Sequence, residues 1–330
     1  MKLAVKFATD DSRSAKLQNG ENYLPGRKFI IPVDKKKAIA SGTVHPKDTA
    51  KIVDNIVFTI TGNVIGKSDL IMLDLFASND WERPIYFTSV GMGTFASLKN
   101  YSQNEGFAYR LVPVKNDTPN DSRINSDILY TNLMENFEYR NLNNMDVYHE
   151  WTEIRTLRVV GIRDKFALLA EQLTKEGQKE KAALALKRSF KVLPLERLPI
   201  DYFSRNIFRI YYATGDFAAA DSITLKAAKS AIQEINFVMQ RDPLISNGYM
   251  REEQMAYLVV QEIMDVLQRN NREAVQAEVR KMLKETLKDK TPIISEIEQL
   301  PREQKDVVRM MFAIDQKHLS TWIQTLPAEE

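Results

Sequence analysis

The chain has 330 residues, of which 46 are basic and 44 acidic, giving a formal net charge of +2 at pH 7. This balance provides no long-range field for nucleic acid and no polybasic anchor for a membrane surface. Because the sequence contains no cysteine, disulfides, thiolate metal sites and cysteine nucleophiles are excluded. The length exceeds that of a usual single domain, so two domains are expected.

The N-terminal stretch is the first amphipathic segment. Leu3, Val5 and Phe7 alternate with other residues and are compatible with a short strand or a short helix. The segment is too short and too charged for a signal peptide. We therefore expect either a cytosolic chain or a piece of a longer protein, and a start directly on an amphipathic segment favours the piece.

Two strands are predicted next. Residues 28–33 form an apolar run in which Pro32 marks an edge or an end, and residues 55–60 are rich in β-branched and aromatic side chains. A short helix over residues 34–41 is expected between them. Residues 69–76 then predict a helix with Ser68 as its N-cap and Asp69 in its first turn. Since this helix is apolar nearly all round, we expect it to lie buried between layers.

The pattern of helix, polar loop and strand then repeats. Strands are predicted over residues 85–88 and 107–112, and a helix capped by Thr94 runs to about Tyr101. Strands separated by short helices favour a small α/β layer with some parallel pairing. Residues 116–122 are expected to form an exposed loop, and residues 127–134 and 137–139 short helical pieces. The domain boundary is predicted at the end of this region, giving an α/β domain over residues 1–145 and an all-α domain over residues 146–330.

The second domain shows a period of 3.6 residues throughout, typical of helices. The pair 163–176 and 180–193 matches the tetratricopeptide repeat, with Gly177 at the turn and Pro194 at the end. A second unit places Gly215 at the matching turn. A third pair, over residues 252–268 and 272–287, carries Asn270-Asn271 in place of the glycine. Residues 293–299 and 301–324 are predicted to be capping helices.

Candidate site residues are few. The cluster Asp80-Trp81-Glu82-Arg83 has two interpretations. An exposed Trp81 flanked by charges would stack on a sugar or a peptide, whereas a buried Trp81 would fill the core beside a turn and leave Glu82 to pair with Arg83. The second interpretation is favoured. In the helical domain, a concave partner-binding groove is predicted to be lined by Phe203, Arg209, Gln254 and Tyr257.

No motif indicates a cofactor, a metal or a catalytic nucleophile. The histidines, His45, His149 and His318, lie far apart in the sequence without the neighbours of a metal site. Phosphate-loop and serine-hydrolase motifs are not found. The sequence therefore predicts neither a cofactor nor a metal.

Two segments carry a resemblance to a known family. Residues 70–88 (L-I-M-L-D-L-F-A-S-N-D-W-E-R-P-I-Y-F-T) and 101–113 (Y-S-Q-N-E-G-F-A-Y-R-L-V-P) resemble the C-terminal soluble region of multi-spanning membrane proteins abundant in Bacteroidetes. That family, long known only as a domain of unknown function, is similar to transmembrane protein O-mannosyltransferases. The residues that match its pattern are Asp80, Trp81, Glu82, Arg83, Tyr86, Glu105, Tyr109 and Arg110.

The resemblance implies an extracytoplasmic accessory domain, on the periplasmic face of the inner membrane, of a membrane-embedded glycosyltransferase. It supplies no catalytic residue, because the family's catalytic loop lies in membrane segments that have no counterpart in this sequence. The implied partner is an acceptor protein or glycan, with the membrane reached only through an N-terminal region not present here. Two alternatives stay open, namely a free-standing helical-repeat scaffold for protein binding and a small α/β enzyme that uses Asp80 or Glu82 as acid or base.

Overall fold

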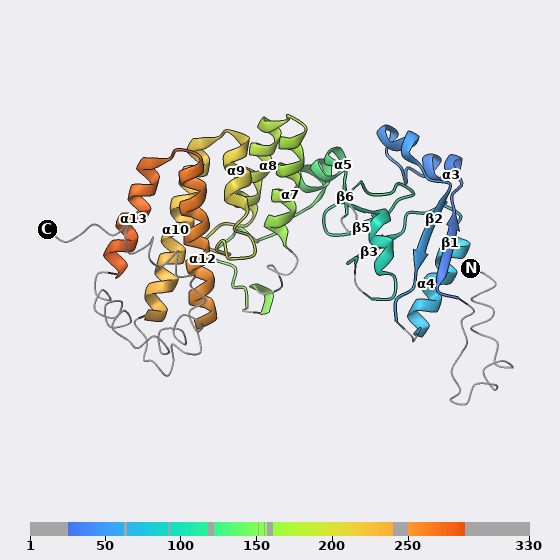
Figure 1. Cartoon of the computed structure of the whole chain (residues 1–330), viewed down its shortest axis with the longest axis horizontal. Helices are drawn as coiled ribbons and strands as arrows, with labels where there is room; N and C mark the ends of the chain where they lie inside the picture. The colour runs from blue at the N-terminus through green and yellow to red at the C-terminus, as the bar shows by residue number, and fades with distance from the viewer. Residues whose placement is uncertain are drawn as a thin grey trace, which may run out of the picture. The chain divides into compact units, whose positions relative to one another are not determined.

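The structure is a computed structural model. It describes residues 26–62, 65–91, 93–117, 122–150, 152–154, 156, 161–239 and 250–287. The fold is mixed α/β, with two small sheets and many helices (Figure 1). The chain divides into two compact units, Met1–Phe137 and Glu138–Glu330, which are described separately below. The segment around Leu3 and the expected capping helices after residue 292 lie outside the described residues.

A two-stranded antiparallel ribbon begins the described part of the first unit. Strand β1 (Lys28–Pro32) pairs with β2 (Asn55–Thr59), with Ile30 opposite Val57. Inward and outward side chains alternate on both strands, so Phe29, Ile31, Ile56 and Phe58 face the core. The predicted strands and the position of Pro32 at the end of β1 are confirmed.

Two short helical elements connect these strands. Helix α3 (Lys35–Ala40) begins at Asp34, whose carboxylate accepts a hydrogen bond from the backbone N–H of Lys37 at 3.1 Å. The 3₁₀ helix η1 (Pro46–Lys51) follows. Its Asp48 is buried and forms an ion pair with Arg123, which links η1 to strand β6 (Arg123–Ile124) of the second sheet.

Helix α4 (Lys67–Ser78) corrects two predictions. Its N-cap is Gly66 rather than Ser68, because the Asp69 carboxylate accepts from the Gly66 N–H at 2.9 Å and fixes the helix start two residues earlier. The helix is also not buried between layers. Leu73 and Phe76 are buried, whereas Ile71 is 68% exposed and Leu75 41% exposed, since only one face of α4 packs against the protein.

The second sheet has the order β3-β5-β4-β6. Strand β5 (Tyr109–Leu111) pairs antiparallel with β3 (Tyr86–Phe87) and with β4 (Ser102–Asn104), and β4 pairs parallel with β6. Some parallel pairing is thus confirmed, although antiparallel pairing prevails. The segment before β4 is a 3₁₀ helix, η2 (Ala96–Tyr101), with Phe95 at its start, so the predicted cap at Thr94 is wrong.

The core of the first unit lies between the ribbon, α4 and η2. An aromatic cluster holds it together, in which Phe58 contacts Phe29, Phe76 and Phe95 at ring-centroid distances of 5.6, 5.8 and 6.1 Å. The unit ends with helix α5 (Ser126–Thr131) and a π-helical turn, η3 (Asn132–Asn136). The helical piece predicted at residues 137–139 is not formed.

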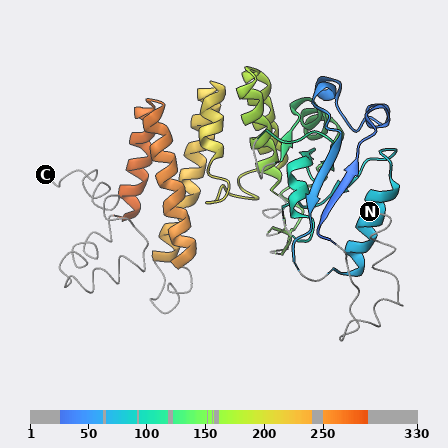
Figure 2. The same ribbon diagram turned by 45° about the vertical axis from the view of Figure 1, so that its right-hand side comes forward.

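The second unit consists of helices that stand side by side, with α7 and α8 at one end and α13 at the other (Figures 1 and 2). Helix α7 packs against α8 and α9, and α10 packs against α12 and α13. The helices of this unit for which bounds are given are α7 (Ile162–Lys175), α8 (Lys179–Val192), α9 (Ile207–Thr214), α10 (Phe217–Met239), α12 (Met250–Arg269) and α13 (Glu273–Leu287). The predicted helices of the three pairs are therefore present.

Three short turns within this unit share one backbone feature. Gly177 between α7 and α8, Gly215 between α9 and α10, and Asn271 between α12 and α13 have positive φ angles of 80°, 88° and 55°. In the first and third turns the residue that follows donates its N–H five residues back, Gln178 to Leu173 and Arg272 to Leu267. Each turn thus has a left-handed residue at the end of its first helix, at the positions where the sequence predicted the turns, Gly177, Gly215 and Asn271.

Candidate functional site

A strained turn follows α4 and carries the charged tryptophan cluster. The Glu82 N–H donates to the Asn79 carbonyl at 3.0 Å, and both central residues, Asp80 and Trp81, have positive φ angles of 46° and 62°. Two consecutive left-handed residues define a turn of the type I′ class. Such turns normally use Asn and Gly, so the residues found here are held by contacts elsewhere.

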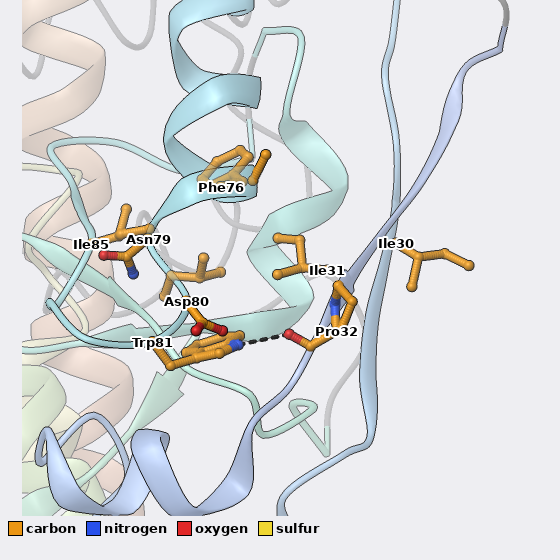
Figure 3. A pocket seen from close by; sticks show the side chains of 10 residues that line it. Ile30, Ile31, Pro32, Phe76, Asn79, Asp80, Trp81 and Ile85 are labelled. Carbon is orange, nitrogen blue, oxygen red and sulfur yellow. Dashed lines mark hydrogen bonds between the residues drawn. The ribbon is translucent and has the colours of Figure 1, made fainter. Parts of the chain in front are cut away.

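The Trp81 side chain supplies those contacts. It is only 5% exposed, and its indole Nε1–H donates to the carbonyl oxygen of Pro32 at 2.8 Å (Figure 3). Burial of a tryptophan removes roughly 200 Å² from water and is worth about 5 kcal/mol at most. The two left-handed residues cost about 1–2 kcal/mol each. Burial therefore exceeds the strain, and the turn keeps its shape because it places Trp81 in the core.

The charged neighbours of Trp81 do not pair as predicted. Asp80 and Glu82 both bind the ammonium group of Lys37 from α3, with Glu82 at 3.3 Å. These hydrogen bonds, the one to Asp80 first, raise the pKa of Lys37. Arg83 is exposed and does not pair with Glu82, because the turn directs Glu82 toward α3. A role of these four residues in binding stays a prediction.

A cavity of about 400 Å³ lies next to Trp81. Figure 3 shows Ile31 pointing into it from β1, with Phe76 and Ile85 on the other side, whereas the Ile30 side chain points away from the cavity. Its volume falls in the range of small-ligand sites. Its wall combines apolar side chains with polar atoms, and the lining residues are Ile30, Ile31, Pro32, Phe76, Ala77, Asn79, Asp80, Trp81, Ile85 and Leu111.

A polar cluster around a buried carboxylate on the second sheet involves one other candidate, Arg110. Its centre is Glu105, 6% exposed, which accepts from the Tyr86 hydroxyl at 2.7 Å and from the Gln103 amide at 2.8 Å. Arg110 lies 3.7 Å from the same carboxylate and 5.6 Å from the Tyr86 ring centre. Burial, and then the bond to Glu105, raises the pKa of Tyr86 to about 12.

This cluster explains why residues 101–113 carry so many polar side chains in a strand region. A buried carboxylate needs hydrogen-bond partners, and here Tyr86, Gln103 and Arg110 provide them. The structure thus brings Arg110 together with Tyr86 and Glu105. Tyr109, on the same strand, is partly buried and faces away from this carboxylate because side chains alternate along β5.

The candidates in the helical unit occupy two elements and the loop before them. Phe203 is 68% exposed in the loop before α9, and Arg209 is exposed on α9. Tyr257 is partly buried on α12, and Gln254 belongs to the same helix. Helices α9 and α12 contact each other, and Arg205, in the loop before α9, lies 4.0 Å from Glu262 on α12. The predicted lining residues are thus on neighbouring elements, and their role in binding stays a prediction.

Sequence reasoning missed Arg163, which holds the connection between α8 and α9. It is 3% exposed and donates to the carbonyl oxygens of Leu193 and Leu198, each at 2.8 Å, with its guanidinium 5.2 Å from the Phe190 ring centre. Burial lowers its pKa to about 10. A charged residue at the buried end of an apolar helix face was the signal available in the sequence.

The described residues contain no group of three or more His, Asp or Glu side chains arranged to hold a metal ion. None of the helices in the described part of the chain combines the length and the hydropathy needed to span a bilayer.

These features define a mixed α/β unit with a cavity beside an edge strand, together with a second unit of packed helices. In comparison with known proteins, residues 1–128 match the family model called TMEM260-associated domain 2. TMEM260 is a membrane protein, so the first unit is similar to a domain associated with a membrane protein. No curated protein and no solved structure matches the chain.

Proposed function

We propose that the chain is a non-catalytic accessory region of a membrane-embedded, O-glycosyltransferase-like protein. The observation that carries this proposal is the match of residues 1–128 to a domain family associated with TMEM260. In the proposal the chain works on the extracytoplasmic, periplasmic side of the membrane. Its task there is to hold an acceptor protein or glycan, or to stabilise the membrane part.

The helical unit is the proposed binding part, and we assign it a tetratricopeptide-like architecture. Support comes from the repeated turn, in which Gly177, Gly215 and Asn271 each occupy the left-handed position between two helices. The spacing from Gly177 to Gly215 exceeds the period of about 34 residues of that repeat. Arg163 accounts for the difference, because it fixes the additional residues between Leu193 and Leu198 by their carbonyl oxygens.

The exposed aromatic residue next to α9 supports a binding role for the helical unit. Phe203 stands in a loop held by Asp201, whose carboxylate accepts from the N–H groups of Phe203 and Ser204, each at 3.1 Å. A large exposed aromatic side chain on a fixed loop is typical of an anchor for a protein partner. Arg209 and Tyr257 on the adjoining helices complete the proposed groove.

The test is affinity purification of the tagged chain from native membranes. We expect a multi-spanning membrane protein to co-purify in stoichiometric amount, or to be encoded in the same reading frame. Phe203→Ala combined with Arg209→Ala should reduce binding of the acceptor polypeptide by about tenfold or more, which corresponds to roughly 1.4 kcal/mol. Leu184→Ala, at a position on α8 that is 52% exposed, is the matched control and should bind normally. Recovery of the chain without any membrane protein would contradict the proposal.

A further inference from the structure

The cavity beside Trp81 has a wall of two chemically different parts. Ile31, Phe76 and Leu111 are buried and line it with apolar side chains. The side chains of Asn79 and Asp80, in the turn after α4, belong to the same lining and add a carboxamide and a carboxylate (Figure 3). A ligand that fits this cavity therefore needs an apolar stem and a polar end.

The charges next to the cavity indicate that the polar end is a cation. Asp80 and Glu82 share the single ammonium group of Lys37, which leaves one negative charge uncompensated among these three side chains. Among the described residues, no other basic side chain forms an ion pair with either carboxylate. Both carboxylates are largely exposed and can accept further hydrogen bonds.

A lysine side chain meets both requirements. Its aliphatic stem packs against apolar surface while its ammonium group stays at a polar end. In this cavity the stem would contact Ile31 and Phe76, and the ammonium group would bind Asp80. A charge-assisted hydrogen bond of this kind is stronger than one between neutral groups.

Strand β1 adds backbone groups to the same cavity. The N–H of Ile60 donates to the Arg27 carbonyl and the N–H of Val33 donates to the Asp54 carbonyl, at 2.9 and 3.0 Å. Because bonded and non-bonded positions alternate along an antiparallel pair, Ile30 directs its N–H and its C=O away from β2.

This outer edge of β1 faces the cavity. The carbonyl of Pro32, two residues further along the same edge, accepts from the Trp81 indole at 2.8 Å. Ile30 borders the cavity although its side chain points away from it, so its backbone is the part turned toward the cavity (Figure 3). In the part of the chain that the structure describes, no partner is found for the N–H or the C=O of Ile30.

We propose that this site binds an extended, lysine-containing peptide segment of a partner protein. The segment pairs antiparallel with β1, because one residue of an antiparallel strand exchanges both hydrogen bonds with the one residue Ile30. The peptide residue opposite Ile30 has its side chain on the outer face, as Ile30 has. The next peptide residue, opposite Ile31, points into the cavity, and this is the lysine that binds Asp80. The pairing ends at Pro32, whose carbonyl is already bound by Trp81.

Fluorescence anisotropy of the full chain with synthetic peptides tests the proposal. The probe is a fluorescein-labelled heptapeptide of threonine with lysine at its centre. The same peptide with norleucine at the centre keeps the stem without the charge and should bind about three- to tenfold more weakly, and glutamate should bind more weakly still. N-methylation of the residues on both sides of the lysine removes the amides that pair with Ile30 and should weaken binding by about tenfold. This comparison uses the unaltered protein and is independent of how any variant folds.

Two variants with matched controls locate the site. Ile30→Pro removes the outward N–H and should abolish binding, whereas Val57→Pro removes the equivalent N–H from the other edge of the ribbon and should bind normally. Asp80→Asn keeps a residue that accepts a positive φ, and should reduce the preference for lysine over norleucine to less than about twofold. Asp54→Asn removes an exposed carboxylate that pairs with Lys35 away from the cavity, and should leave the preference unchanged.

Four outcomes would overturn the proposal. They are no binding of the lysine peptide at about 1 mM, equal binding of the N-methylated peptide, equal binding to the two proline variants, and equal affinity for the lysine and norleucine peptides. Binding of free lysine amide as tightly as the peptide would also overturn it, since the ligand would then be a small amine. Phe203→Ala combined with Arg209→Ala should bind the peptide normally, so this site and the groove proposed in the helical unit fail independently of each other.

Discussion

Replacement of Trp81 tests whether the turn after α4 exists to bury this side chain. Trp81→Ala removes nearly the whole buried side chain and should destabilise the first unit by about 3–5 kcal/mol. Trp81→Phe keeps most of the apolar contact but loses the bond to the Pro32 carbonyl, 2.8 Å long. Because that carbonyl borders an open cavity where water can replace the indole, the expected cost is about 1–2 kcal/mol.

A third replacement separates packing from backbone strain. Trp81→Gly also loses the side chain, but glycine adopts a φ of +62° without steric cost. It should therefore be about 1 kcal/mol less destabilising than Trp81→Ala, the reverse of the order found in helices. A lower stability of the glycine variant would show that the strain in this turn is negligible.

The assay must report on the first unit alone, because the helices of the second unit dominate circular dichroism. Hydrogen exchange of the Ile31 and Phe58 amides, measured as a function of urea, meets this need. Arg83→Ala, two residues along the chain and exposed, is the matched control and should change stability by less than about 0.5 kcal/mol. If Trp81→Ala cost no more than Arg83→Ala, Trp81 would not be a core residue and its interpretation as a binding residue would return.

Three further predictions concern other parts of the chain. Arg163→Met leaves two buried carbonyl oxygens without a donor and should cost the helical unit about 2–5 kcal/mol in urea unfolding; a cost below about 1 kcal/mol would contradict the anchoring role. The pKa of the Tyr86 hydroxyl is raised to about 12 in the folded state, so its contribution to stability is present below pH 10 and is lost as pH rises to about 12. Tyrosinate absorbance at roughly 295 nm, followed during a pH titration, should show one late-titrating tyrosine fewer in Tyr86→Phe. The Cβ added in Gly177→Ala would meet no atom within 4 Å, so the expected loss of stability of about 1–2 kcal/mol comes from the backbone conformation. Asn271→Gly should instead stabilise the helical unit by less than about 1 kcal/mol, and thermal unfolding should show these opposite signs.

The sequence predicted the local elements of the first unit well where one face of an element is buried. Strand β1 followed from an apolar run, strand β2 from its β-branched and aromatic residues, and α3 lies within the short helix expected over residues 34–41. For α4 the same reasoning was wrong, because its composition does not reveal how many layers surround it. Ile71 is apolar and yet exposed, since no second layer covers that side of the helix in the described unit.

The buried polar contacts were beyond the reach of local patterns. Glu105 and Tyr86 are nineteen residues apart in the sequence, and the sheet order brings them together. Arg163 reaches carbonyl oxygens thirty and thirty-five residues away. Such contacts depend on the tertiary fold, whereas the turns at Gly177 and Gly215 were predictable because only local backbone geometry is required there.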